Sequence, residues 1–360
     1  MTSSLVGSEM CIRDRFISTI FKTFYPRRGY YLIQEDIMKN ILLSDKLIAA
    51  IQDYMPVNQK AVPFLMDILD ISRESAYRRV RGDIPLTLEE AAIISAKLGL
   101  SLDELVGQNS KERAFFDLNV SKTLEATETY SQIINNINNI YEKIRKAKSS
   151  EVIIANNRVS IVLTANYEYI KKFRYFKWVH QTHNVPLNFY FSELEVPSQL
   201  NADYKKYAYN YLRLNNITLI VDKNVFSSLI DEMLYYYRRN LIDKEELKAM
   251  QEELRQIVNE LEQILQTGTN KAGVNMLIYL SALNIESNYS YLEYDGNVCS
   301  QFWVYTVNPI MVFNHEACAI QKKWLESLMK YSTLITKSNE LLQAEFLNSQ
   351  REYVEAMISD

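Results

Sequence analysis

The chain has 360 residues, of which 48% are hydrophobic and 23% charged, and this balance is typical of a globular protein of two or three domains. A formal net charge of −4 excludes a chain coated with positive charge, so any contact with nucleic acid must be local. The three cysteines are too few for a disulfide framework and favour a reducing cytoplasm. No apolar run approaches the length of a membrane span.

The N-terminal segment 1–37 is expected to be an artefactual or disordered tail. Residues 4–15, S-L-V-G-S-E-M-C-I-R-D-R, resemble a translated sequencing adapter, and the residues that follow show no clean helical or strand period. Segments of this kind are set aside before fold reasoning. Met38 is the expected start of the native chain, because M-K-N-I-L-L-S-D-K-L leads directly into the first periodic segment.

The segment 71–82, I-S-R-E-S-A-Y-R-R-V-R-G, predicts a short capped helix. Ser72 stands where an N-cap accepts a backbone N–H, and Gly82 stands where a chain leaves a helix with positive φ. Ala76 and Val80 are four residues apart and share one face. Four arginines and one glutamate give this segment a charge of +3. Such a helix suits the DNA major groove, and the alternative is a solvated surface helix.

The neighbouring segments predict the rest of a helix-turn-helix domain over residues 38–108. A helix with Pro63 near its start precedes the turn, and the capping box Thr87-x-x-Glu90 opens the helix that follows the loop. Two helices joined by a tight turn, inside a set of five, form the helix-turn-helix arrangement. The five expected helices cover residues 45–54, 62–69, 71–82, 88–98 and 101–107.

These residues resemble the helix-turn-helix module of the phage-repressor (Xre-like) class, and S-R-E-S-A-Y-R-R-V-R-G followed by P-L-T-L-E-E-A and S-L-D-E-L resembles its BetR-type branch. The resemblance covers residues 45–107. It implies double-stranded DNA as the partner, with one helix reading base edges. The implied base contacts are Arg73, Glu74, Tyr77 and Arg78. The implied phosphate contacts are Ser72, Arg79 and Arg81.

The segment departs from the class at two positions. The turn residue is often glycine in the class, and here it is Asp70. A position that is often apolar is here Arg79, with Val80 beside it. The sequence therefore leaves the rotation of this helix about its own axis undetermined by about one residue, which corresponds to about 100°. The roles of Arg78 and Arg79 are exchangeable for this reason.

The remainder predicts a helical linker at 109–150 and an α/β (α+β) domain at 151–360 that senses a ligand or mediates oligomerisation. Short apolar runs predict strands, and longer runs with helical spacing predict helices between and after them. The expected strands cover residues 151–156, 217–221, 275–280, 289–294, 302–307 and 310–313. The expected helices cover residues 120–147, 167–180, 203–214, 225–239, 243–268, 316–331 and 339–357.

Three other features of the C-terminal part have ordinary structural readings. His180 and His183 have a metal-ligand spacing without a third ligand nearby, so surface histidines are expected. Cys299 or Cys318 as a nucleophile lacks any surrounding signature. The basic residues of 171–177 could touch nucleic acid, but a solvated face of an amphipathic helix is the expected role. No catalytic residue, metal or cofactor is therefore predicted.

The sequence favours a cytoplasmic transcription regulator that binds DNA as a homodimer, responds to an unidentified small-molecule effector and does not associate with membrane. The alternatives are an enzyme in the C-terminal domain and a protein-interaction adaptor. The pairing surface is expected at 120–147, where Ile133, Ile137, Ile140 and Ile144 repeat at four, three and four. The heptad pattern at 247–264 is the alternative seam, although packing against the sheet explains it equally well.

Overall fold

A computed structural model describes residues 43–54, 61–98, 102, 105, 116, 126–183, 185–303 and 307–358. The chain divides into two compact units, Met1–Arg113 and Ala114–Asp360. The expected tail at 1–37 lies outside the described residues, as does most of the expected helix at 101–107. Within the described residues, no helix combines the length and the apolar character needed to cross a lipid bilayer.

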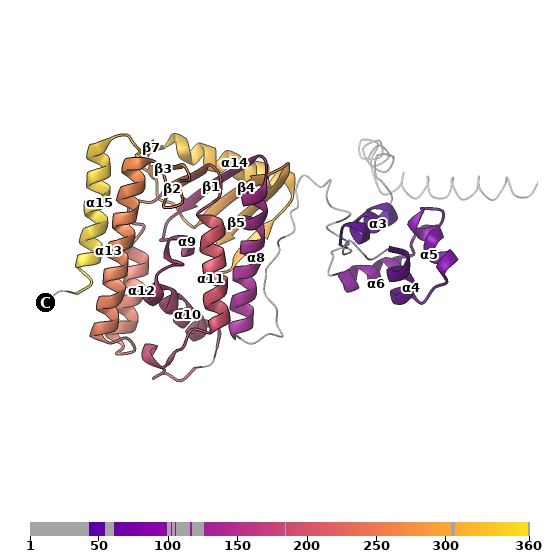
Figure 1. Ribbon diagram of the computed structural model, residues 1–360, viewed down its shortest axis with the longest axis horizontal. Helices are drawn as coiled ribbons and strands as arrows, with labels where there is room; N and C mark the ends of the chain where they lie inside the picture. The colour runs from indigo at the N-terminus through magenta and orange to yellow at the C-terminus, as the bar shows by residue number, and fades with distance from the viewer. Residues whose placement is uncertain are drawn as a thin grey trace, which may run out of the picture. The chain divides into compact units, whose positions relative to one another are not determined.

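The first unit contains four described helices around one small core (Figure 1). Its helices are α3 (Leu43–Tyr54), α4 (Ala61–Leu69), α5 (Arg73–Val80) and α6 (Leu88–Leu98). Each helix contributes at least one buried apolar side chain to the core, which explains why such short helices are stable only together. The fully buried side chains are Leu47, Ile51, Leu65, Ala76 and Ile94.

The second unit is a mixed sheet of seven strands with helices on both faces. The strand order is β6-β5-β4-β1-β2-β3-β7, and β1, β2 and β3 are parallel while the other neighbours are antiparallel. The strands are β1 (Ser150–Asn156), β2 (Ile217–Val221), β3 (Met276–Ser281), β4 (Tyr289–Tyr294), β5 (Asn297–Trp303), β6 (Pro309–Val312) and β7 (Ser332–Leu334).

The helices of this unit connect the parallel strands and close the chain. The connection from β1 to β2 contains α9, α10, η1 and α11, and the connection from β2 to β3 contains α12 and α13. The bounds are α8 (Ala126–Lys146), α9 (Ile161–Thr164), α10 (Glu168–Thr182), η1 (Phe191–Glu193), α11 (Ser198–Tyr211), α12 (Ser227–Arg238), α13 (Lys244–Thr267), α14 (His315–Lys330) and α15 (Glu340–Glu355).

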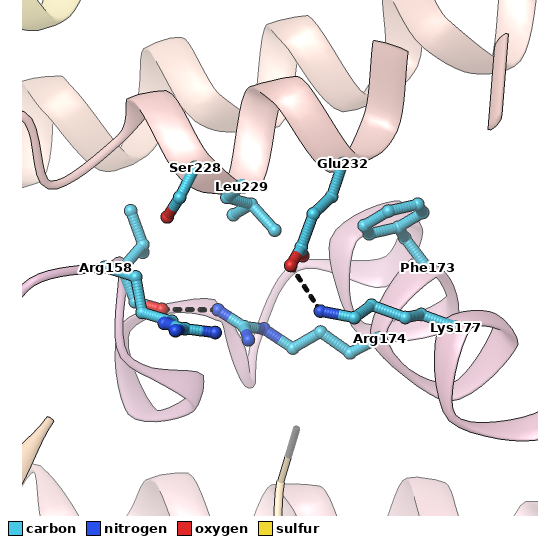
Figure 2. Close-up of a pocket in the computed structure, with 8 residues that line it drawn as sticks. Arg158, Phe173, Arg174, Lys177, Ser228, Leu229 and Glu232 are labelled. Atoms are coloured by element: carbon cyan, nitrogen blue, oxygen red, sulfur yellow. Dashed lines mark hydrogen bonds and ion pairs between the residues drawn. The ribbon is translucent and has the colours of Figure 1, made fainter. Parts of the chain in front are cut away.

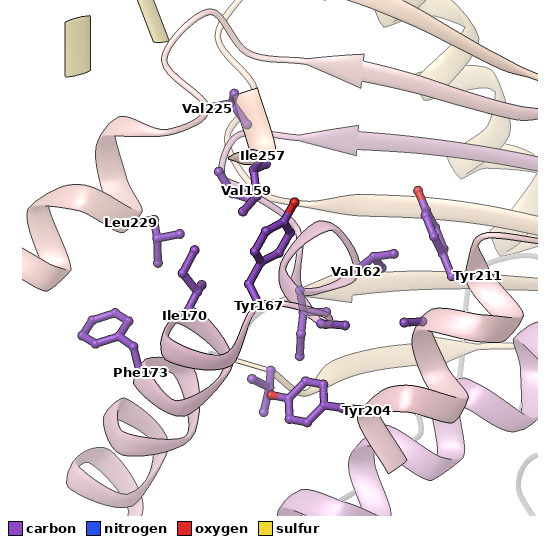
Figure 3. Close-up of a cluster of buried hydrophobic side chains, with 14 of the residues drawn as sticks. Val159, Val162, Tyr167, Ile170, Phe173, Tyr204, Tyr211, Val225, Leu229 and Ile257 are labelled. Carbon is purple, nitrogen blue, oxygen red and sulfur yellow. The ribbon is translucent and has the colours of Figure 1, made fainter. Parts of the chain in front are cut away.

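Two apolar cores lie on opposite faces of the sheet, because successive residues of a strand point to opposite sides. Val152 and Ile154 of β1 belong to the larger core, shared with helices α8 to α13 and α15, whereas Ile153 belongs to the smaller core under α14. Figure 3 shows part of the larger core, where Tyr167 and Ile170 pack among side chains from the neighbouring helices. The strand β1 is therefore buried on both faces.

Helix α8, which forms residues 126–146 of the expected linker at 109–150, packs within the second unit and is not a free linker. Residues 109–125 lie outside the described residues, apart from residue 116. Figure 1 shows α8 and α11 side by side. The rings of Tyr141 and Tyr207 have centroids 5.5 Å apart, and Arg145 Nε donates to Asn210 Oδ1 at 2.8 Å. Ile133, Ile137 and Ile144 are fully buried in the larger core. The isoleucines expected to form a dimer seam thus hold α8 to its own unit.

The heptad pattern at 247–264 is likewise used for packing within the second unit. Its apolar side chains on α13 are buried in the larger core, in agreement with packing against the unit rather than a free seam. The flank of α13 lies along α15 (Figure 1), where Gln251 Nε2 donates to the carbonyl of Val354 at 2.9 Å. Both surfaces considered for pairing are therefore occupied within one copy.

One expected strand was misplaced. The strand expected at 302–307 is β5, which begins at Asn297 and ends at Trp303, and residues 304–306 lie outside the described residues. Asp295 and Gly296 both have positive φ, 45° and 82°, and they form the two-residue turn of a hairpin between β4 and β5. An Asp-Gly pair between strands is a strong hairpin signal, and it fixes where β5 starts.

Candidate DNA interface

The local sequence explains why α5 is short and sharply bounded. Ser72 has extended backbone angles, and its hydroxyl accepts a hydrogen bond from the backbone N–H of Ser75 at 3.3 Å. At the other end, Gly82 has φ of 78°, and the N–H of Asp83 donates to the carbonyl of Arg78 at 2.8 Å. These contacts satisfy terminal backbone groups that would otherwise lack partners.

The turn between α4 and α5 consists of residues 70–72. Asp70 has φ of 51°, in the left-handed region. This conformation explains why glycine suits the position in related modules, because glycine adopts positive φ without a steric penalty. Aspartate is one of the few other residues that tolerate it. The departure at Asp70 is therefore compatible with the same tight turn.

One side of α5 is exposed and carries the predicted base-reading residues. Arg73, Glu74, Tyr77, Arg78 and Arg81 are all exposed, and at about 100° per residue they span about 140° of the helix. Ala76 on the opposite side is fully buried. The structure thus brings the four predicted base contacts onto one exposed face, with three arginines and one glutamate along it.

Arg79 does not lie on this face, which corrects its predicted role as a phosphate contact. Its Nε and Nη2 atoms donate to the two carboxylate oxygens of Glu90, at 3.0 and 2.6 Å, and Nη1 donates to the hydroxyl of Ser75 at 2.5 Å. The Arg79 side chain is only 12% exposed. A paired guanidinium that is largely buried in this way holds helices together. Of the two arginines, Arg78 is the exposed one, and its contact with a base stays a prediction.

Glu90 combines two roles that the sequence showed only in part. It completes the expected capping box, since the N–H of Thr87 donates to Glu90 Oε2 at 3.0 Å and the N–H of Glu90 donates to Thr87 Oγ1 at 3.2 Å. The same carboxylate accepts two hydrogen bonds from the Arg79 guanidinium. These contacts hold the pKa of Glu90 below its ordinary value, chiefly through the hydrogen bond from Arg79. The pair fixes α5 against α6.

Ser72 and Arg81, the other predicted phosphate contacts, lie at the two ends of α5. Both side chains are exposed. Arg81 forms an ion pair with Asp83 at 2.8 Å, and 65% of the Arg81 side chain is exposed. Such a surface pair is weak enough to exchange for another anion. Their contact with phosphate stays a prediction.

The alternative sites in the second unit find no support from geometry. Within the described residues, no three histidine, cysteine, aspartate or glutamate side chains gather into a metal-binding group. His180 packs on the ring of Phe176 at 4.4 Å, whereas His183 contacts the hydroxyl of Thr182. Cys299 and Cys318 are buried in the two different cores, on opposite faces of the sheet.

Comparison with known proteins places the first unit in a family context. No curated protein and no solved structure matches the chain. A protein-family model does match: the BetR domain, over residues 43–130. That range begins at the first residue of α3 and includes the whole α4–turn–α5 unit with its exposed arginine face. Residues 43–130 of this chain thus match the BetR family of helix-turn-helix DNA-binding domains, a range that extends into the start of α8.

Proposed function

We propose that the chain is a sequence-specific DNA-binding transcription regulator in which α5 reads base edges. The observation that carries this proposal is the division of arginines around α5. Arg79 is withdrawn into a structural ion pair, while Arg73, Arg78 and Arg81 remain exposed with one carboxylate, Glu74, among them. An excess of positive charge attracts phosphate, and Arg, Glu and Tyr side chains supply donors and acceptors for base edges.

The two other functions differ in how they would use this face. If the chain acted only as an enzyme through its second unit, the exposed arginines of α5 would have no role. The sequence also contains no recognisable catalytic motif that would support this alternative. A protein adaptor would use an acidic partner on the same face. Selection from random duplex DNA with the full chain separates the classes, because a regulator recovers one sequence motif whereas an adaptor recovers none.

Alanine substitutions of α5 are expected to separate base contacts from phosphate contacts. Arg73→Ala and Arg78→Ala should each cost about 1–3 kcal/mol of specific binding and relax the choice at one base pair. Arg81→Ala should weaken binding to every sequence and reduce the salt slope by about one unit. Fluorescence anisotropy with the selected site and with scrambled DNA, over a range of salt concentrations, measures both effects.

Lys97→Ala is the matched control, because Lys97 is an exposed cation on α6 outside this face. It should change binding little. Equal weakening of all sequences by Arg78→Ala would show that Arg78 contacts phosphate alone. A change in base preference with Arg81→Ala would show that the reading face extends past the end of α5.

The regulator is proposed to act as a homodimer, because one helix-turn-helix module makes few contacts and two-fold pairing doubles them. With α8 and α13 occupied, an exposed apolar stripe along α14 is the pairing surface that we favour. The stripe consists of Ile320 and Trp324 on α14, which are 63% and 60% exposed, and of Tyr331 at its C-cap; Phe313, also exposed, precedes the N-cap of the helix. Apolar side chains this exposed are suited to a protein interface.

The stripe is self-complementary when two copies of α14 run antiparallel. Ile320 and Trp324 are four residues apart on one face of α14, so Ile320 meets Trp324 of the second copy. On one flank Glu316 and Lys330, both exposed, then face each other with opposite charge. Lys323 lies near the two-fold axis, where its long side chain can extend into solvent.

Charge placed on the stripe should therefore give monomers. Ile320→Asp with Trp324→Asp is expected to convert a dimer into a folded monomer, because two carboxylates per copy would be buried at the interface. Light scattering at micromolar concentration measures the mass, and circular dichroism checks folding. Leu341→Asp on α15, where Leu341 is 72% exposed, is the control and should remain dimeric. A wild-type monomer under these conditions contradicts the pairing proposal.

A further inference from the structure

Helix α10 carries two buried cations, contrary to the solvated basic face expected at 171–177. Arg174 and Lys177 are 7% and 8% exposed. Both point into a pocket between α10, the segment after β1 and the start of α12 (Figure 2). Burying a cation is costly unless an anion or several hydrogen bonds compensate for lost hydration. The partners of these two side chains therefore decide what the pocket can bind.

Arg174 has neutral partners in the described residues. Its Nε donates to the hydroxyl of Thr164 at 2.8 Å, and its Nη2 donates to the carbonyl of Val159 at 2.6 Å. A guanidinium has five N–H donors, so most of its capacity is left for another acceptor. Burial lowers the pKa of Arg174, although the charge of the nearby Glu232 acts in the opposite direction. Thr164 and Val159 hold the guanidinium in place, and within the described residues it forms no ion pair of its own.

The pocket as a whole has an excess of positive charge. Lys177 Nζ contacts Glu232 Oε1 at 2.5 Å, which accounts for one cation and one carboxylate. Arg158, an exposed residue, also lines the pocket. Three cations and one carboxylate leave a net charge of +2 among the lining residues. An anion is therefore the ligand that this arrangement favours.

The first turn of α12 adds a hydroxyl and the positive end of a helix. The Ser228 hydroxyl is buried and has no hydrogen-bond partner in the part of the chain that the structure describes, and Ser228 lines the same pocket. The N-cap residue of α12, Phe226, offers no side-chain cap. The N-terminus of a helix carries partial positive charge and suits anions. A hydroxyl without a partner and a guanidinium without an ion pair, as judged among the described residues, thus line one pocket.

The position in the fold agrees with a ligand site. Arg158 follows the carboxyl end of β1, and α12 follows the carboxyl end of the parallel strand β2. In open α/β sheets, ligands bind in the crevice outside the carboxyl ends of parallel strands. The enclosed part of the pocket is only about 10 Å³, room for about one water-sized group, and the rest of its space opens to solvent. One oxygen atom of an oxyanion would fill the enclosed part, with the rest of the group on the solvent side.

We propose that this pocket binds the oxyanion group, a phosphate or a carboxylate, of a small-molecule effector. Arg174 and Ser228 bind one oxygen atom from inside, and Arg158 binds the rest of the group from the solvent side. Lys177 remains paired with Glu232 and adds positive charge. The anion site stands on the pocket alone, whereas its role as an effector site rests on the proposed function as a DNA-binding regulator.

Isothermal calorimetry of the full chain, with inorganic phosphate and with acetate at constant ionic strength in chloride, tests the site. Saturable binding of either anion supports the proposal, and the preferred anion indicates whether phosphate or carboxylate is recognised. Arg158→Gln should weaken binding at least about fivefold by removing one charged donor. Binding of neither anion, or equal binding by Arg158→Gln and wild type, overturns it.

Two further variants distinguish anion binding from a loss of stability. Glu232→Gln removes the competing carboxylate and should tighten anion binding about fivefold, the opposite direction to Arg158→Gln. Arg213→Gln removes an exposed arginine outside the pocket and should leave the affinity unchanged. If Glu232→Gln also weakens binding while its melting temperature stays at the wild-type value, the charge argument fails.

The regulatory step has its own readout. The affinity of the full chain for its selected DNA is measured with and without the bound anion, and Arg158→Gln should remove any difference while keeping wild-type DNA affinity without anion. An anion that binds but leaves DNA affinity unchanged overturns the effector role. Absence of DNA binding altogether overturns the proposed function instead, and calorimetry still reports on the anion site.

Discussion

Ile137→Asp combined with Ile144→Asp is expected to unfold the second unit rather than produce a folded monomer. Both isoleucines are fully buried between α8 and the rest of the larger core. Each aspartate would place a carboxylate in an apolar site without a partner, and burial of an unpaired charge is among the largest single-residue effects on stability. We expect the free energy of unfolding to fall by more than about 4 kcal/mol. Urea unfolding followed by near-ultraviolet circular dichroism measures it.

Leu341→Asp is the matched control, because Leu341 on α15 is 72% exposed and lies outside the proposed pairing stripe. It should change the free energy of unfolding by less than about 0.5 kcal/mol. Ile137→Val, which removes one methylene group, should cost about 0.5–1.5 kcal/mol. A stable, folded double mutant at 137 and 144 would restore α8 as a candidate seam and contradict its burial.

Arg79→Ala is expected to destabilise the helix-turn-helix unit by about 2–4 kcal/mol, because it leaves the Glu90 carboxylate without the guanidinium fork that satisfies it. The side chains of Arg79 and Glu90 are only 12% and 15% exposed, so solvent replaces little of the lost interaction. Thermal unfolding of this unit, monitored by far-ultraviolet circular dichroism, gives the loss.

Arg78→Ala is the control at the adjacent position, since Arg78 is exposed and its loss should change stability little. The pH dependence gives a second readout. Arg79 holds the pKa of Glu90 below its ordinary value of 4.5, so the pair stabilises the folded state above that pH and loses this contribution as pH falls through the lowered pKa. Arg79→Ala should flatten stability over that acid range. An unchanged acid profile would show that the pair contributes little.

The bounds and the buried face of α5 could be predicted because they depend on residues within the segment itself. Ser72 and Gly82 mark the two ends of α5 in sequence, and the spacing of Ala76 and Val80 defines its inner face. The role of Arg79 was not predictable, because it depends on Glu90 from the next helix. Within α5 alone, Arg78 and Arg79 look alike, and only the packing of α5 on α6 distinguishes them.

The partners of each amphipathic element were much harder to predict than the elements themselves. The isoleucines of α8 predict a helix with one apolar face, but the same face would suit a second copy or a neighbouring helix. The pairing of Tyr141 with Tyr207 is a contact between distant segments that local spacing does not contain. The burial of Arg174 likewise depends on other segments, because the Thr164 hydroxyl and the Val159 carbonyl accept hydrogen bonds that water would otherwise accept.

The order of strands in the sheet has a consequence for synthesis on the ribosome. The central strand β1 pairs on one side with β4, through Ser150 and Tyr294, so its edge stays open until β4 has been made. Helix α6 of the first unit ends at Leu98, about 200 residues earlier, which is about 10–40 s of translation at about 5–20 residues per second. Helices α3 to α6 of the first unit are therefore synthesised while the hydrogen-bonding edge of β1 is still unpaired. Chains truncated before β4 should aggregate through that edge with these helices attached.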